Sequence, residues 1–505
     1  MSDPGTQDQT SRFEVGLERS MRTAGLMAGP PLALLIYLWN PAALPAEGRR
    51  LFGILTLAVC FWITEAIPLP ATALLASSLA IVCGVAPARA VLAPYADPVI
   101  FLFVGSFLMS ELFSKYGLDR KIAGVVMRSR TFGRTPGGLV AGFGLASATI
   151  STWMSNTATA ALMTPIALGA VREPGDGRSA ARAAPWASGV LLMVAYGASV
   201  GGMATLIGTP PNLLVAGFLE RLAGVRVTFT GWLVFGLPIS LVLLVASTLW
   251  TRLALRRLLG GSIPAPPPAP AGGHDEKERR AGARWTIAAF CLAGLLWTLP
   301  SLAALALGRE SSLAVTLSRL LPEGGVALLC ASLLFLAPAD WKRRRFALTW
   351  TEGRQVNWGI ILLFGGGLSL GTLAEATGLA RWAGEGIGRM GLSATPAGLL
   401  AVSVAVAIVV SEFASNTASA TMLVPVVIAA AQAAGFDPVR PALGVGLAVT
   451  CGFIFPVSTP PNAIVFGTGL VPLWRMVRVG ILLDLTSFSV VWLGLLALTP
   501  LLPHA

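Results

Sequence analysis

The amino-acid sequence predicts an all-α polytopic membrane protein, built as an inverted-topology repeat with two re-entrant hairpins and two broken helices. Three observations support this prediction. Of the 505 residues, 55% are hydrophobic and 12% are charged, whereas soluble domains carry about 25% charged residues. Apolar segments long enough to cross a bilayer recur along the chain. Two polar motifs inside such segments each occur twice, once in each half.

We expect about eleven transmembrane spans, because a helical span needs about 20 predominantly apolar residues. Residues 1–24 are polar and charged, so they are predicted to form a cytoplasmic tail without a cleaved signal peptide. An N-terminal half then covers 25–255 and a C-terminal half covers 285–505. The expected spans lie near 25–40, 50–66, 69–86, 97–114, 186–220, 230–255, 285–307, 323–338, 356–376, 442–468 and 474–500.

Residues 256–284 separate the two halves. This segment is rich in proline, glycine and charged residues, so it cannot bury a core and is predicted to be a flexible linker. Basic residues gather in the connections 115–135, 252–284 and 339–355. All three connections are cytoplasmic if the N-terminus is inside and the spans alternate, which places the C-terminus outside. The net charge of +12 therefore reflects membrane orientation, and no nucleic-acid partner is predicted.

The first repeated motif is Ser-Asn-Thr. It occurs in "WMSNTATAALMTP" (153–165) and in "FASNTASATMLVP" (413–425). Each copy divides a segment into two apolar arms of roughly 15 residues, which are too short for comfortable spans. We therefore expect re-entrant hairpins at 136–170 and 395–430, with the triplet capping the second arm. Unpaired backbone groups at such a turn need protein, water or a ligand as a partner.

The second repeated motif is Thr-Pro-Pro-Asn, at 209–212 and at 459–462. Two prolines cannot continue a helix without freeing backbone carbonyls, so the spans 186–220 and 442–468 are expected to unwind there. Upstream of the hairpins, "VGSFLMSELFSKYGL" (104–118) parallels "FGGGLSLGTLAEATGL" (364–379). The order span, hairpin, broken span therefore occurs twice.

The charge pattern indicates that the two copies face opposite sides of the membrane. Residues 115–134 carry six basic side chains and residues 171–184 carry three. The corresponding stretches of the second copy, 376–396 and 431–441, carry two and one. The first hairpin is then expected to open to the cytoplasm and the second to the exterior. Discontinuous segments at matching places of inverted repeats are typical of a transporter's binding site at the middle of the membrane.

Such a site favours an anion together with cations. Helices that start near Asn156 and Asn416 direct free N–H groups and positive dipole ends at the centre, which suits an anionic substrate. The unwound carbonyls suit Na⁺. No Arg or Lys falls in these stretches, so co-transported cations are expected to balance the substrate's charge. An enzyme is not predicted, because His274 and His504 lie outside the membrane and the five cysteines show no metal-ligand spacing.

The two Ser-Asn-Thr hairpins, the two Thr-Pro-Pro breaks and "WITEAIPLPATALL" (62–75) together resemble the divalent anion:sodium symporter family, which carries di- and tricarboxylates. The resemblance covers nearly the whole chain except the N-terminal tail and the linker. It implies a homodimer in the inner membrane that works by an elevator movement of a transport domain against a dimerising scaffold. It also implies substrate contacts from Asn156, Thr157, Thr209, Pro210, Ser415, Asn416, Thr417, Thr459 and Pro460.

The resemblance further implies two Na⁺ sites. One would lie among Ser151, Ser155, Asn156 and Gly208, and the other among Ser411, Ala414, Asn416 and Ser458. The function implied is Na⁺-coupled import of dicarboxylates of the succinate, malate and fumarate class, or of citrate. A Na⁺-independent dicarboxylate exchanger and a carrier of sulfate or another divalent anion remain alternatives. Two acids, Glu412 beside the second triplet and Asp484 inside an apolar segment, fit either a local hydrogen-bonding role or a role in ion transfer.

Overall fold

A computed structural model of the protein describes residues 4–39, 44–129, 131–133, 135–171, 186–256, 276–308, 310–389 and 395–499. The described chain is almost entirely helical. Most of the expected linker, 257–275, lies outside the described residues. Residues 276–284, which we expected to belong to the linker, instead form the first turns of a long helix. Glu276 at its start is paired with Arg279 and Arg280, which stabilises a helical N-terminus.

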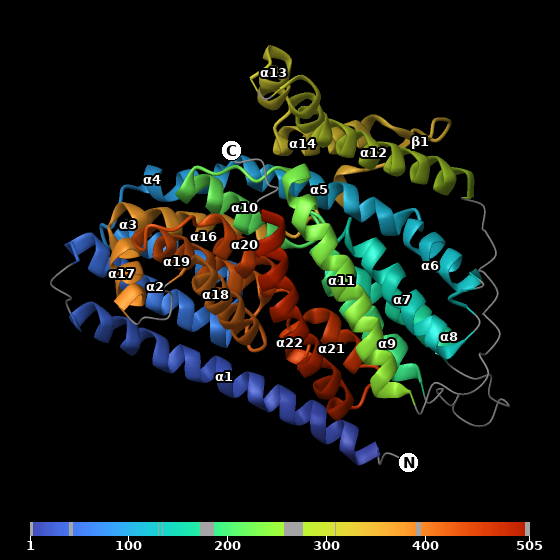
Figure 1. Ribbon diagram of the computed structural model, residues 1–505, viewed down its shortest axis with the longest axis horizontal. Helices are drawn as coiled ribbons and strands as arrows, with labels where there is room; N and C mark the ends of the chain where they lie inside the picture. The colour runs from blue at the N-terminus through green and yellow to red at the C-terminus, as the bar shows by residue number, and fades with distance from the viewer. Residues whose placement is uncertain are drawn as a thin grey trace. The chain divides into compact units, whose positions relative to one another are not determined.

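Figure 1 shows the course of the chain. The elements of the first part are α1 (Pro4–Trp39), α2 (Ala46–Thr64), α3 (Leu69–Val82), α4 (Ala88–Leu92), η1 (Ala93–Ala96), α5 (Pro98–Lys115), α6 (Leu118–Arg128), α7 (Pro136–Ser151), α8 (Asn156–Val171), α9 (Ala187–Gly202), α10 (Pro210–Ala223) and α11 (Phe229–Leu255). Those of the second part are α12 (Glu276–Leu307), α13 (Ser312–Leu320), α14 (Glu323–Leu336), β1 (Pro338–Asp340), β2 (Arg345–Phe346), α15 (Trp350–Gly353), α16 (Trp358–Ala376), α17 (Leu379–Arg389), α18 (Pro396–Ser411), α19 (Asn416–Ala433), α20 (Val439–Ala448), η2 (Pro456–Ser458), α21 (Pro460–Phe466) and α22 (Leu473–Leu498).

The series α5 to α11 is repeated by α16 to α22. Each series contains a long helix, a helix of 11 residues, a first hairpin arm of 16 residues and a second arm that starts at the Ser-Asn-Thr motif. A broken helix and a further long helix follow. The first helix of each series also packs against a helix that lies upstream of the other series. Thus α5 packs against α14, and α16 packs against α3. The predicted order of span, hairpin and broken span is therefore confirmed.

Seven of the described helices are long and apolar enough to cross a membrane, or eight if the bent pair α13–α14 forms one span. Six of the seven coincide with expected spans, and the seventh, α19, is the second arm of the second hairpin. The expected total of about eleven is higher because it also counts four segments that do not meet both conditions. These are α2, whose 19 residues include three charged ones, α3, with 14 residues, and the two broken spans, whose first helices α9 and α20 have 16 and 10 residues.

The chain forms two compact units. Unit 1 comprises Met1–Asp97, Leu214–Arg226 and Trp358–Val449. Unit 2 comprises Pro98–Leu213, Val227–Asn357 and Thr450–Ala505. Each unit therefore combines segments from both halves of the sequence.

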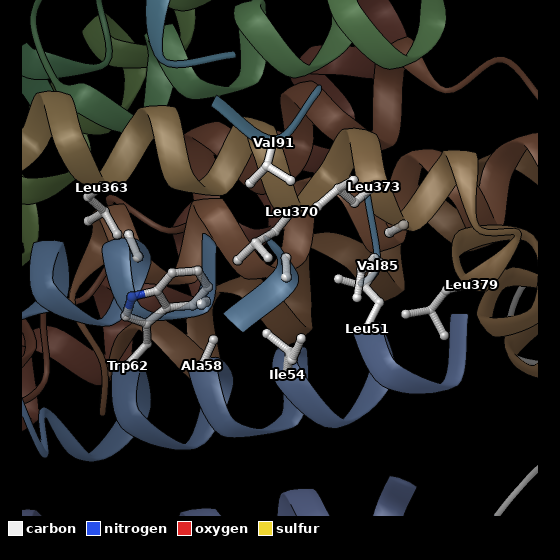
Figure 2. Packing of buried hydrophobic residues seen from close by; sticks show 14 of the residues in the cluster. Leu51, Ile54, Ala58, Trp62, Val85, Val91, Leu363, Leu370, Leu373 and Leu379 are labelled. Atoms are coloured by element: carbon white, nitrogen blue, oxygen red, sulfur yellow. The ribbon is translucent and has the colours of Figure 1, made fainter. Parts of the chain in front are cut away.

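Unit 1 contains a buried hydrophobic cluster from α2, α3 and α16, which Figure 2 shows from close by. Leu51, Ile54, Ala58 and Trp62 recur every three or four residues, so they form one face of the helix. The same cluster includes Leu363, Leu370 and Leu373 of α16. The indole Nε1 of Trp62 donates to the Leu69 carbonyl at 3.2 Å and thereby fixes the turn into α3.

Unit 2 holds the first hairpin arm against α9 through a glycine seam, which we define as Gly144 and Ala148 of α7 with Gly197 and Gly201 of α9. A Cβ added to Gly197 would lie 2.5 Å from the Gly144 carbonyl oxygen, and one added to Gly201 would collide with the Ala148 carbonyl. The backbones of α7 and α9 therefore touch directly, as small residues allow between membrane helices. Figure 1 shows α7, α8 and α9 side by side.

Candidate functional site

The tip of the first hairpin lies between the end of α7 at Ser151 and the start of α8 at Asn156. The Ser151 hydroxyl donates to Asn156 Oδ1 at 2.8 Å. Ser155 Oγ accepts from the Ala158 N–H at 3.3 Å, so the predicted cap of the second arm is present. Ser151 and Asn156 are both buried, whereas Thr157 is exposed. The tip is thus a preformed turn with polar groups directed inside the protein.

The tip of the second hairpin, in unit 1, repeats this geometry. The Ser411 hydroxyl lies 2.9 Å from Asn416 Oδ1, and it also contacts the Val449 carbonyl. Ser415 occupies the N-cap position of α19, but its side chain makes no capping hydrogen bond. The prediction of a side-chain cap was therefore wrong at Ser415, where only the backbone carbonyl accepts a bond, from the Ser419 N–H at 2.8 Å.

The first break, residues 203–209, packs against the first hairpin tip within unit 2. Thr205 Oγ1 donates to the Thr152 carbonyl at 2.6 Å. Gly202 leaves so little room that an added Cβ would collide with Asn156 Oδ1. A Cβ added to Gly208 would in turn lie 2.5 Å from the Gly202 carbonyl oxygen. Through these contacts the fold brings Ser151, Asn156 and Gly208 of the first predicted Na⁺ set together.

A small cavity borders this region. It is lined by Ser155, Gly208 and Pro210, and by Ser106 and Ser110 of α5 among others. Its volume of about 10 Å³ suits roughly one water-sized particle, so it is too small for a dicarboxylate. Ser106 Oγ is buried and has no hydrogen-bond partner in the part of the chain that the structure describes.

Sequence reasoning missed Ser106 and Ser110. The available signal was their spacing of four residues, which places two hydroxyls on one face of an otherwise apolar helix. The second copy of this helix has Gly366 and Leu370 at the matching positions. The polar pair therefore belongs to the first copy alone.

The second break, residues 449–459, continues into unit 2. Thr459 caps α21, because its Oγ1 accepts from the Asn462 N–H at 3.3 Å. Ser458 Oγ accepts from the Phe455 N–H at 3.3 Å. The Tyr196 hydroxyl of α9 donates to the Phe453 carbonyl at 3.1 Å, and α21 packs against α8 and α9. Ser458 and Thr459 therefore share a unit with the first hairpin and the first break.

The remaining predicted residues divide between the units. Ser411, Ala414 and Asn416 lie together in unit 1, whereas Ser458 belongs to unit 2. The second Na⁺ set and the complete substrate set therefore stay predictions. Glu412 and Asp484 are buried, and each is engaged in an interaction. Within the described residues, no group of three His, Cys, Asp or Glu is placed to hold a metal ion.

Comparisons with known proteins identify the family of this chain. The family model described as the sodium:sulfate symporter transmembrane region matches residues 26–501. The sodium-dependent dicarboxylate transporter SdcS of Staphylococcus saprophyticus is 31% identical over 492 residues, which cover 94% of this chain and 91% of that protein. The protein of the same name from Staphylococcus aureus is 30% identical over 488 residues, with 94% and 91% covered.

A solved structure supports the fold. The YdaH transporter of Alcanivorax borkumensis matches with a TM-score of 0.60 at 17% identity, over 95% of this chain and 97% of that chain. At this identity the likeness concerns the arrangement of helices alone. The arrangement is that of a polytopic membrane transporter.

Proposed function

Because this chain belongs to the sodium:sulfate symporter family, also called divalent anion:sodium symporters, we propose that it imports dicarboxylates into the cell together with Na⁺. The observation that carries the proposal is the repeated tip geometry. In each half a serine hydroxyl at the end of one arm holds the asparagine that begins the next. The relatives' names supply the substrate class and the coupling ion.

The substrate's carboxylates would bind where helices begin. The helices α8 and α19 start at Asn156 and Asn416, and α10 and α21 start at the two proline pairs. The first turns of α8 and α19 carry N–H groups without intrahelical partners, whereas α10 and α21 begin with prolines, which have no N–H. All four N-termini present the positive end of a helix dipole, at about 0.3–2 kcal/mol per favourable interaction. Several such ends are needed to replace the water around a dianion. Thr157, Thr417 and the two prolines would complete the substrate contacts.

Na⁺ would offset the substrate's charge. The two tips and the two breaks contain no Lys or Arg, and a dianion without a counter-charge would be costly inside a membrane protein. Ser151, Ser155, Asn156 and Gly208 supply oxygen ligands on one side, and the Ser411 set supplies them on the other. We expect at least two Na⁺ for each dianion. A third would make transport electrogenic, at about 2.3 kcal/mol per net charge per 100 mV.

The family also supports the finer proposals. The protein acts as a homodimer in the inner membrane, with a cytoplasmic N-terminus and an exterior C-terminus. The halves 25–255 and 285–505 form the inverted repeat, and residues 1–24 and the linker are cytoplasmic. The first hairpin opens to the cytoplasm and the second to the exterior. An elevator movement then exposes the site alternately to the two sides.

Uptake into proteoliposomes tests the function. Vesicles without internal substrate are given labelled succinate, malate, fumarate, citrate or sulfate, with an inward Na⁺ gradient or with choline in place of Na⁺. We expect Na⁺-dependent accumulation of a dicarboxylate. Uptake that needs preloaded dicarboxylate and ignores Na⁺ would establish the exchanger instead, and accumulation of sulfate alone would establish the third alternative.

The variants Asn156→Ala and Asn416→Ala test the two tips. Each removes an amide that the structure holds in place, yet neither removes a span, so the folded protein should survive in detergent while transport is abolished. If either variant transports at the wild-type rate, its tip is only a capped turn and does not bind the substrate.

A further inference from the structure

Each helix break leaves backbone carbonyls that need hydrogen-bond partners. The helix α9 ends at Gly202, and α10 resumes at Pro210. The intervening residues leave the helical ladder, and the two prolines have no N–H to offer. A carbonyl without a partner is costly inside a membrane protein. The same need arises at the second break.

One asparagine meets this need in each half. Asn212 Nδ2 donates to the carbonyls of Gly202 at 2.9 Å and Thr205 at 2.7 Å. Asn462 Nδ2 donates to the carbonyls of Gly452 at 3.1 Å and Phe455 at 3.0 Å. In both halves the acceptors precede the asparagine by 10 and 7 residues. The same brace therefore spans both breaks.

The bonds of each asparagine come from its amide nitrogen. Both side chains are fully buried, and all four acceptors are carbonyls, so the nitrogen and oxygen of each amide can be told apart. The oxygens, Asn212 Oδ1 and Asn462 Oδ1, are buried and accept no hydrogen bond among the described residues. A substitution that keeps the shape and removes the donors therefore isolates what the brace does.

The first brace holds the part of the break that touches the predicted Na⁺ ligands. Gly202, whose carbonyl it binds, lies against Asn156 Oδ1, and Gly208 lies against the same carbonyl. Thr205, whose carbonyl is the second acceptor, donates its own hydroxyl to the first hairpin tip. Asn212 therefore fixes two points of the break, and both of them contact the tip.

We propose that Asn212 and Asn462 are positioning residues that set the Na⁺ affinity of the transporter by holding the two breaks in shape. This inference rests on the proposed Na⁺-coupled function and extends it to two residues outside the predicted ligand sets. Neither residue needs to touch the cation. Each acts through the carbonyls it binds, as residues behind a metal's own ligands do.

The test compares Asn212→Leu and Asn462→Leu with Ser240→Ala in the full-length protein. Leucine has nearly the shape of asparagine and no donor. Ser240 is a matched control, because its buried hydroxyl donates to the Val200 carbonyl on α9 at 2.7 Å, just before the break. The unfolding temperature in detergent is measured against NaCl concentration at constant ionic strength with choline chloride, and Na⁺-dependent succinate uptake is measured in proteoliposomes.

We expect the half-saturating Na⁺ concentration to rise about 10- to 100-fold in both leucine variants in the two assays, as for other partners of metal ligands. The half-saturating succinate concentration at saturating Na⁺ should change far less. Ser240→Ala should lower the unfolding temperature in choline and leave the Na⁺ dependence unchanged. If a leucine variant does not fold, the serine substitution at the same position keeps one donor and should show a smaller rise.

Two different results would overturn the inference, and only one of them would also refute the proposed function. Leucine variants that behave like Ser240→Ala, with lower stability and wild-type Na⁺ dependence, would make the asparagines structural and leave the proposed function intact. A wild-type protein that Na⁺ neither stabilises nor drives would refute the proposed coupling, and this inference with it.

Discussion

Alanine at Gly202 is expected to displace Asn156 without unfolding the protein. The added Cβ would collide with Asn156 Oδ1, and because optimal contact lies near 3.5 Å, the two atoms must separate by roughly 1 Å. The Asn156 side chain ends in a rotatable amide, while Gly202 lies at the end of the buried helix α9. The side chain should therefore turn away, because the backbone is held on both sides.

The size of the effect follows from what that rotation breaks. The Ser151 hydroxyl loses its acceptor, a net cost of about 0.5–1.5 kcal/mol for one hydrogen bond. The displaced oxygen is also an expected Na⁺ ligand. Together these changes should raise the half-saturating Na⁺ concentration about 10- to 100-fold, which corresponds to about 1.4–2.8 kcal/mol.

The assay is a Na⁺ titration of the unfolding temperature in detergent, repeated as a Na⁺ titration of uptake in proteoliposomes. Gly294→Ala is the matched control, since no heavy atom lies within 4 Å of the Cβ it would add. This control should keep the wild-type Na⁺ dependence. A Gly202→Ala protein that folds and also responds to Na⁺ like the wild type would refute the role given to Asn156.

Three further predictions concern other parts of the chain. Ser151→Ala and Ser411→Ala each lose one hydroxyl, about 1 kcal/mol, and should raise the Na⁺ concentration for half-maximal uptake about fivefold while leaving substrate preference unchanged. A cysteine near Gly175 should react with an impermeant label from the cytoplasm and one near Ala434 from outside, and labelling from one side only would refute the inverted repeat. Burial alone would raise the pKa of Glu352, but hydrogen bonds from Lys115 and from Thr349 lower this pKa below its usual value. The carboxylate therefore stabilises the fold fully above about pH 4.3 and loses this effect as the pH falls through the lowered pKa. Glu352→Gln should cost about 0.5–1 kcal/mol at neutral pH, and its difference from the wild type in thermal unfolding should shrink toward pH 3.

The hairpins were predictable because their signals are local. The expected bounds 136–170 and 395–430 agree closely with helices that run from Pro136 to Val171 and from Pro396 to Ala433. In both copies a threonine caps a helix whose first residue is proline, which is a strong start signal. The Ser-Asn-Thr triplet then marks the start of the second arm. These signals act within a few residues and need no tertiary contact.

The features that escaped prediction depend on distant contacts. Nothing near Asn212 in the sequence indicates that its amide reaches back ten residues to the Gly202 carbonyl. Ser106 and Ser110 become part of the site only because α5 packs near the first tip. The start of α12 at Glu276 was masked by the average composition of the linker, although its charge pairs are local.

The glycine seam has a mechanical consequence. Helices whose side chains interdigitate can slide past one another by small steps that repack those side chains. Between α7 and α9 the carbonyl oxygens of Gly144 and Ala148 lie directly against glycines, so at these two points the backbones leave no room for side chains to repack. Shear along this pair would bring the side chains of neighbouring residues against these close backbone contacts, so we expect a large movement to carry α7 and α9 together. The first tip and the first break, at the ends of these two helices, then keep their mutual geometry throughout the cycle. A cation bound between them would cross the membrane in an unchanging coordination shell.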